Sequence, residues 1–347
     1  MVGGEAAGYV AHAAPQQVRI PQSSADWLWE QDVNHYPEWS YTMFNKKTLL
    51  ALLISAAAAN AMAASSEAYV DQDGNNQQAT VTQEGGDQFA LVFQDGEGNI
   101  GTTYQAGSDN LSGVYQAGNM NVAAVTQSST NSGSTVVQAG FANKAEVLQV
   151  ATNNTSFVNQ TGEANEAFVT HGGGGSHFSE VTQNGISNDA TLKQGGNGNW
   201  SFITQAGNDN KANVGQYGNN NLSDVSQNGN DNVATVSQKD TGMVYADQIG
   251  TGNELLVTQG DLAVAEILQT GEFNDVEIEQ KGSGNYANVD QYGQSNNTDI
   301  TQSGTDNDAY IVQGGVSNMA VAMQSGVGDL ASIIQAGSNN MATVTQK

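Results

Sequence analysis

The sequence predicts an all-β protein: a two-sheet parallel β-solenoid, cross-β and amyloid-like, of about 13 coils of 22 residues. Three observations predict it. Glutamine returns every eleven residues over most of residues 83–346. Small, β-branched and amide residues occupy alternate positions, which is the period of a strand with one buried face. The small residue alternates between serine and alanine from Ser112 to Ala234, so the true repeat is a pair of strands.

Each eleven-residue unit contains one strand and one turn. The consensus is Asn-x-Ala/Ser-x-Val/Ile-x-Gln-x-Gly-x-x, and residues 211–218 are a clear copy. The alternating positions predict a strand of about six or seven residues. The glycine and the asparagine predict a turn of about four residues, because both residue types tolerate turn conformations. Proline is absent from the repeats, as a continuous hydrogen-bonded sheet requires.

The inward side chains predict a narrow core stabilised by stacked amides. Buried Gln and Asn are costly alone, but in register each amide can hydrogen-bond to identical amides in the adjacent coils. Polar low-complexity sequence does not hold such a register. The predicted ladder residues are Gln83, Gln94, Gln105, Gln116, Gln138, Gln194, Gln205, Gln216, Gln227, Gln291, Gln302, Gln335, Asn110, Asn210 and Asn221, and the predicted turn residues are Gly107, Gly207, Gly218 and Gly337.

The first and last strands are predicted to mediate self-association. An uncapped coil exposes unpaired backbone groups, and a contact between opposite ends is heterologous, which generates filaments rather than closed rings. The opposing interpretation is that the acidic charge and Lys347 keep the ends apart. The predicted self-association residues are Ala68, Val70, Gln72, Ala342, Val344 and Gln346.

The N-terminal region differs from the repeats. Residues 43–63 combine a charged start, an apolar run and an Ala61-Met62-Ala63 cleavage pattern, which together predict a secretory signal peptide and a mature chain that begins near Ala64. Residues 1–42 contain three of the four Trp residues and no repeat. We therefore expect that the start was assigned too early and that Met43 is the true start; the alternative is a long cytoplasmic leader. Residues 64–347 form the repeat domain.

Composition excludes several classes of function. The net charge is −26 and there is no cysteine, so nucleic acid is not expected as a partner and thiol chemistry does not apply. Asp275, Glu277 and Glu279 alternate on an outward face, but no long loops are available to build a pocket that would shift their pKa values. We expect no enzymatic activity and no cofactor.

Two places depart from the repeat. His171 stands where a glutamine is expected, and a glycine-rich stretch that includes His177 lengthens the next step to twelve residues. Two histidines could bind a metal, but a lengthened turn with a defect in the ladder is the simpler interpretation, and no metal site is expected. Residues 239–268 contain two shortened steps, which predict a place where the solenoid bends or opens first.

The tandem pattern resembles the curlin repeat. Residues 313–324 and 205–212 carry its Gln-x-Gly-x-x-Asn-x-Ala motif, and the resemblance covers roughly residues 67–347. It implies a secreted subunit of curli, the amyloid fibres of bacterial biofilms. Its implied partners are itself, another curlin subunit and the outer-membrane curli secretion and assembly proteins. Familiar curlins carry fewer repeats and a targeting segment before the first one, whereas here the first strand follows the cleavage site almost directly.

Three functions compete. The first is a structural subunit of an extracellular fibre for adhesion and biofilm matrix, which polymerises by end-to-end strand templating. The alternative is a monomeric surface-binding β-solenoid adhesin, but the regular outward Thr-x-Thr arrays of ice-binding solenoids are missing, since Thr80/Thr82 and Thr343/Thr345 stand isolated. An enzyme that acts on polysaccharides lacks the loops that a pocket needs. Whether the subunit elongates or nucleates fibres stays open.

Overall fold

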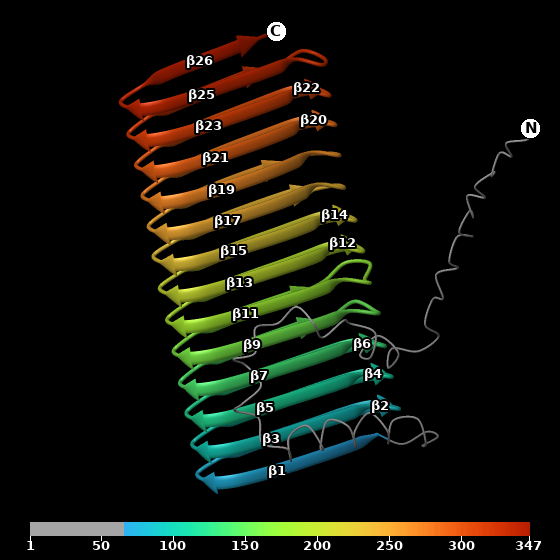
Figure 1. Ribbon diagram of the computed structural model, residues 1–347. Helices are drawn as coiled ribbons and strands as arrows, with labels where there is room; N and C mark the ends of the chain where they lie inside the picture. The colour runs from blue at the N-terminus through green and yellow to red at the C-terminus, as the bar shows by residue number, and fades with distance from the viewer. Residues whose placement is uncertain (1–65) are drawn as a thin grey trace, which may run out of the picture. The chain divides into compact units, whose positions relative to one another are not determined.

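The computed structural model describes residues 66–347, so the predicted signal peptide at 43–63 and the segment 1–42 lie outside the described residues. Strands and turns account for the regular structure of the described part. Figure 1 shows the strands stacked coil upon coil in two layers. No helix long and apolar enough to cross a membrane occurs within residues 66–347.

The strands alternate between two parallel sheets of 13 strands each. Sheet A contains β1 (Glu67–Asn75), β3 (Phe89–Glu97), β5 (Leu111–Asn119), β7 (Gly133–Phe141), β9 (Thr155–Glu163), β11 (Phe178–Ile186), β13 (Trp200–Asn208), β15 (Leu222–Asn230), β17 (Met243–Thr251), β19 (Val264–Glu272), β21 (Tyr286–Gln294), β23 (Asp308–Val316) and β25 (Leu330–Ser338). Sheet B contains β2 (Gln78–Gly86), β4 (Ile100–Ser108), β6 (Val122–Thr130), β8 (Lys144–Gln149), β10 (Glu166–His171), β12 (Asp189–Asn197), β14 (Lys211–Asn219), β16 (Val233–Lys239), β18 (Glu254–Gln259), β20 (Asp275–Ser283), β22 (Asn297–Thr305), β24 (Met319–Gln324) and β26 (Met341–Gln346).

The sheet order confirms the predicted solenoid. Each strand pairs with the strands two places before and after it in the chain, so every coil adds one strand to each sheet. In this register each position of the repeat pairs with the equivalent position in the adjacent coils. Gln205, for example, pairs with Gln183 on one side and with Gln227 on the other. A shift of one residue would turn every inward side chain outward, so the buried pattern fixes this register.

The strands are longer than predicted. Most contain nine residues rather than six or seven, and only two residues then separate consecutive strands. The extra length comes from the segment after the glutamine, where Gly185 and Ile186 still pair with Gly207 and Asn208 of the next coil. Identical turns stack as regularly as the strands do, so the backbone pairing continues into residues that the sequence assigns to a turn.

The motif asparagine does not take the predicted turn conformation. The left-handed backbone belongs to the residue before it, with φ values of 57° at Asp109, 55° at Asp209 and 55° at Asn220. Asn110 and Asn210 have ordinary backbone angles and are buried. Asp and Asn tolerate the left-handed region because their short side chains bond locally, so the consensus turn residue lies one position earlier than predicted.

The core lies between the sheets and consists of small and β-branched side chains. Val181, Ile203 and Val225 of sheet A and their counterparts in sheet B are buried throughout the stack. The serine–alanine alternation maps onto the sheets: from Ser112 to Ala234 the serines lie in sheet A and the alanines in sheet B. Over these coils sheet A therefore presents serine, and sheet B alanine, at the small inward position.

Four of these serines bury a hydroxyl without a partner, and Ser201 is one of them. Because an unpaired buried hydroxyl costs about 1–3 kcal/mol, we expect Ser201→Ala to raise the free energy of unfolding by about 1 kcal/mol. Urea denaturation of the soluble monomer measures it. Ser179→Ala is the matched control, because the Ser179 hydroxyl bonds His171 Nε2 at 2.9 Å. An equal gain in both variants would contradict the assignment.

The shortened steps in residues 239–268 do not interrupt the sheets. Gln238 Nε2 donates to Gln259 Oε1 at 3.1 Å and Gln259 Nε2 donates to Gln280 Oε1 at 2.9 Å, across both short steps. Each shortened step lacks one residue in a turn that leads from sheet B to sheet A. In these two turns Gly242 and Ala263 occupy the position of the motif asparagine. The described fold is continuous through this segment.

Candidate assembly interface

A column of glutamine side chains runs through each sheet. Gln183 Nε2 donates to Gln205 Oε1 at 2.8 Å, and Gln205 Nε2 donates to Gln227 Oε1 at 2.8 Å. The other hydrogen of Gln205 Nε2 goes to the carbonyl oxygen of Asp189 in sheet B, at 3.0 Å. Each glutamine therefore ties its coil to the next coil and to the opposite sheet. These hydrogen bonds offset the cost of burying the amide.

The structure places the predicted ladder glutamines in these two columns. Ten are at most 2% exposed, whereas Gln335 in the last coil is 7% exposed and Gln83 in the first coil is half-buried. The ten are Gln94, Gln105, Gln116, Gln138, Gln194, Gln205, Gln216, Gln227, Gln291 and Gln302.

The glutamine columns have a direction. From Gln72 to Gln346, each side-chain bond between glutamines runs from the Nε2 of one coil to the Oε1 of the following coil, as in the pairs 72–94 at 2.6 Å and 324–346 at 3.0 Å. Gln335 and Gln346 each use one Nε2 hydrogen on a strand carbonyl. The last coil therefore presents N–H donors at its outer side, and the first coil presents the Oε1 acceptors of Gln72 and Gln83.

A column of asparagines runs in the opposite sense along the edge where sheet A leads to sheet B. Asn210 Nδ2 donates back to Asn188 Oδ1 at 3.0 Å, and its backbone N–H donates to the same oxygen at 3.1 Å. Such bonds continue without a gap from Asn99 to Asn340. Along the other edge, where sheet B leads to sheet A, the asparagine column is interrupted. Two of the predicted ladder asparagines, Asn110 and Asn221, lie along this edge. The edge where sheet A leads to sheet B is thus regular, whereas the variations in repeat length occur at the edge where sheet B leads to sheet A.

The predicted turn glycines lie where coils approach most closely. Gly107, Gly207 and Gly218 have φ values between 103° and 115°, and a Cβ on each would collide with the turn of the next coil. Gly337 has a similar φ of 102°, but its coil is the last, and a Cβ there would meet only Asn340 Nδ2 at 3.7 Å. At Gly107, Gly207 and Gly218 the turns therefore stack through close contacts that a Cβ atom would block.

The end strands expose inward-facing positions that are buried elsewhere. Val70 in β1 is 49% exposed, whereas Val92, one coil further, is fully buried. Ala68 and Gln72 of β1 are exposed as well, and Ala342, Val344 and Gln346 of β26 are half-buried. Both ends thus present the residues that form the core in every other coil, together with the unpaired edge of two parallel sheets.

His171 interrupts the glutamine column. Its Nδ1 lies 3.5 Å from Gln149 Nε2, and its Nε2 lies 2.9 Å from the Ser179 hydroxyl. No ring hydrogen is then left to donate to Gln194 Oε1 in the next coil. That oxygen is buried without a hydrogen-bond partner. Burial, and then the nearby His177, lower the pKa of His171 to about 3. Gln149 donates to Nδ1 and the ring donates from Nε2, which corresponds to the neutral form.

His177 occupies an asparagine position in the lengthened turn. Its Nε2 lies 2.9 Å from the Gly172 carbonyl oxygen, and Asn199 N–H donates to its Nδ1 at 3.3 Å. Both histidine rings therefore form hydrogen bonds within the solenoid, as a lengthened turn with a defect in the ladder predicts. Within residues 66–347 no group of three or more His, Cys, Asp or Glu side chains is arranged to hold a metal ion.

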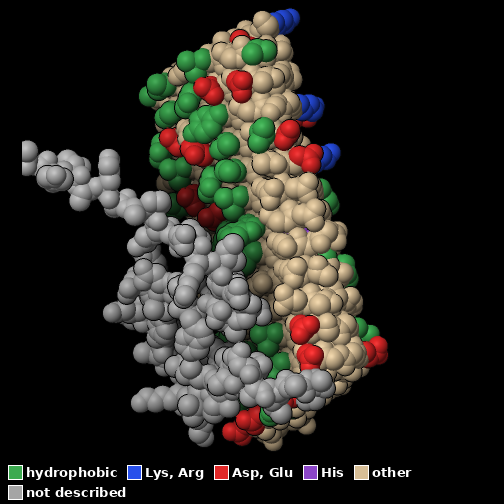
Figure 2. All heavy atoms as spheres, turned by 90° about the vertical axis from the view of Figure 1, so that its right-hand side faces the viewer, with side chains coloured by type: hydrophobic (Ala, Val, Ile, Leu, Met, Phe, Trp, Pro, Cys, Tyr) green, Lys and Arg blue, Asp and Glu red, His purple; other side chains and the backbone are tan. Residues whose placement is uncertain are grey.

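The outer faces of the two sheets differ in charge. Every lysine of residues 66–347 lies in a sheet B strand or directly after one, so the described strands of sheet A carry no cation. In Figure 2 the visible Lys side chains lie along one margin of the solenoid and hydrophobic side chains gather toward the opposite side, whereas acidic side chains occur on both. The lysines are Lys144, Lys193, Lys211, Lys239, Lys281 and Lys347.

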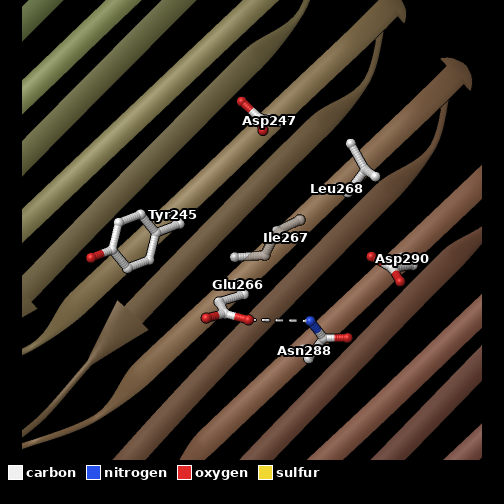
Figure 3. Close-up of a pocket in the computed structure, with 7 residues that line it drawn as sticks. All are labelled: Tyr245, Asp247, Glu266, Ile267, Leu268, Asn288 and Asp290. Carbon is white, nitrogen blue, oxygen red and sulfur yellow. Dashed lines mark hydrogen bonds between the residues drawn. The ribbon is translucent and has the colours of Figure 1, made fainter. Parts of the chain in front are cut away.

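A shallow depression of about 410 Å³ lies on the outer face of sheet A, across β17, β19 and β21 (Figure 3). Tyr245, Asp247, Glu266 and Asp290 are among its lining residues, and Glu266 accepts a hydrogen bond from Asn288 at 3.5 Å. Burial, and then the Glu266 charge, raise the pKa of Asp290. The lining side chains come from regular strands rather than from loops, and they contain no nucleophile paired with a base.

The curlin associated repeat family model matches the chain at residues 130–162, 185–218, 265–293 and 315–347. No curated protein matches the chain. Each matched segment contains the Gln-x-Gly-x-x-Asn unit or a variant of it, whose glutamine and asparagine form the amide columns and whose glycine forms the stacked turn. On the strength of these four matches, the chain belongs to the curlin family.

Proposed function

We propose that the protein is a structural subunit of an extracellular, curli-like amyloid fibre that serves adhesion and biofilm matrix, and that subunits polymerise end to end. The observation that carries the proposal is the match between the two ends: exposed core positions, unpaired sheet edges, N–H donors at the last coil and Oε1 acceptors at the first. Membership in the curlin family supports the same function.

The proposal does not involve catalysis. The inward-facing side chains of the described coils serve the stacking of coils, and the partners proposed are further copies of the chain. By family resemblance we also propose a second curlin subunit and outer-membrane secretion and assembly proteins as partners. Secretion through the predicted signal peptide at residues 43–63 is part of the same proposal.

Polymerisation of the purified protein tests the proposal. After denaturation and return to buffer, we expect sigmoidal thioflavin fluorescence and fibres with a meridional reflection at about 4.8 Å. Fibre fragments should shorten the lag, because exposed end coils act as templates. A soluble β-rich monomer that persists at high concentration and ignores seeds would contradict the fibre function, and would favour the monomeric surface-binding adhesin.

A further inference from the structure

We propose that the last coil is built to receive the first coil of a second copy in one register, β1 on β25 and β2 on β26, which places Lys347 beside Glu84 of the next molecule. The inference rests on the proposed fibre function and deepens it, because it names the residues that meet at the junction. Four features of the described ends favour this register over the alternatives.

The inward columns continue across such a junction without a mismatch. In sheet A the small residue is Ala68 in the first coil and Ala331 in the last, although the coils from Ser112 to Ser223 carry serine there. In sheet B, alanine, valine and glutamine of β26 meet the same three residue types of β2. The stacked inward pairs would be 331/68, 333/70 and 335/72 in sheet A, and 342/79, 344/81 and 346/83 in sheet B.

The direction of the glutamine columns excludes an inverted arrangement. Donors on Gln335 and Gln346 would meet the acceptors on Gln72 and Gln83 of the next copy, as they do between all glutamine pairs inside the molecule. Two first coils placed together would set acceptor against acceptor. Leaving buried amide groups unpaired costs about 1–3 kcal/mol each, so only opposite ends fit.

The order of the strands along the solenoid excludes a junction in which the second copy is rotated by half a coil. β1 precedes β2 along the solenoid, just as β25 precedes β26, so β1 on β25 and β2 on β26 fill both sheets evenly. If β1 sat on β26 instead, one strand position above β25 would stay empty. An empty strand position leaves backbone groups and core side chains without partners. In this rejected register Lys347 would face Asp73 rather than Glu84.

The outer faces match in the proposed register as well. Thr343 and Thr345 would stack on Thr80 and Thr82 of the next copy, which extends two threonine pairs across the junction. Lys347 follows the last glutamine and Glu84 follows the equivalent glutamine of β2, so the two side chains occupy the same outward position. Both are exposed, and opposite charges on neighbouring strands attract.

Engineered cysteines read the register directly, because the chain contains no native cysteine. Paired residues in adjacent strands lie about 4.8 Å apart, which is within the range of about 4.4–6.8 Å that a disulfide spans. We expect fibres of Lys347→Cys with Glu84→Cys to give covalent multimers on oxidation, seen on denaturing gels. The matched pair, Lys347→Cys with Asp73→Cys, should stay monomeric on the same gels.

The outcomes separate the register from the function. Fibres that cross-link through position 73, or that cross-link through neither pair, overturn the register while the fibre function stands. Wild-type protein that forms no fibre overturns the function itself. Multimers through position 84 alone support the proposed register.

Charge reversal gives an independent reading. Lys347→Glu should slow seeded elongation about two- to fivefold at low salt, and adding Glu84→Lys should restore the rate. Lys281→Glu makes the same charge change at an interior coil and is the control. If the double variant elongates no faster than Lys347→Glu alone, the two side chains do not meet.

Discussion

Replacing Gly207 by alanine is expected to lower the free energy of unfolding by about 2–4 kcal/mol. Gly207 has a φ of 114°, a backbone conformation that costs alanine energy, and a Cβ there would overlap the carbonyl oxygen of Gly229 in the next coil. Neither coil can move away, because each is held by its neighbours on both sides. The urea midpoint of the soluble monomer, followed by circular dichroism, measures the effect.

Gly133→Ala is the matched control. Gly133 has no positive φ and a Cβ there would meet no atom within 4 Å. Alanine should be neutral or stabilise by about 0.4–1 kcal/mol, because it restricts the unfolded chain. Equal losses at the two positions would show that the stacked turns are not the constraint that the geometry indicates.

His171→Gln should raise the free energy of unfolding by about 1–2 kcal/mol at neutral pH. A glutamine at this position can accept from Gln149 and donate to Gln194 Oε1, which is now buried without a partner. The repair loses the bond from His171 to the Ser179 hydroxyl, which offsets part of the gain. Urea denaturation of both proteins at pH 7 gives the difference.

The gain should grow in acid. The pKa of His171 falls from an ordinary value of 6.5 to about 3 in the folded protein, because burial disfavours the charged ring. Between these pH values the unfolded chain binds a proton that the folded chain does not, so stability falls by about 1.4 kcal/mol per pH unit as the pH decreases. Burial also lowers the pKa of His177, which makes both proteins less stable in acid but does not contribute to the difference between them.

The carboxylates on the outer face of sheet A act in the opposite direction. Burial raises the pKa of Glu180 and of Asp224, so their protonation favours the folded state as the pH falls. Comparing each variant with wild type at the same pH removes this contribution. His171→Leu is the control: it should remove the same acid sensitivity without the gain at pH 7, since leucine leaves Gln194 Oε1 unpaired. An unchanged pH profile in His171→Gln would refute the role of the buried ring.

Most of the fold could be predicted because one short unit repeats. The eleven-residue spacing of glutamine and the serine–alanine alternation identify two sheets and their register, since each position must stack on its own kind. Strand length and the left-handed residue could not be found in this way. Pairing of the turn residues depends on contacts between coils, and the left-handed position holds Asp109, Asn220 and even Met120, so residue type alone identifies it poorly.

The sequence predicts which residues lie at the two ends of the solenoid. It does not predict which end presents hydrogen-bond donors and which presents acceptors. That Gln72 and Gln346 lie at the ends follows from counting repeats. The sense of the hydrogen bonds does not, because a glutamine amide can donate or accept on either side. Only the second bond, from Nε2 to a strand carbonyl of the opposite sheet, orients each amide and thereby distinguishes the two ends.

The repetition of similar coils has an evolutionary consequence. In the proposed fibre the junction between molecules depends on the first and last coils alone, whereas each interior coil contacts only its neighbours. Recombination between repeats that adds or removes one 22-residue coil, in step with the serine–alanine pairing, leaves both ends and their register intact. If the proposed fibre forms, subunit length can therefore change among descendants without loss of compatibility, and we expect a long variant to join the same polymer as a short one.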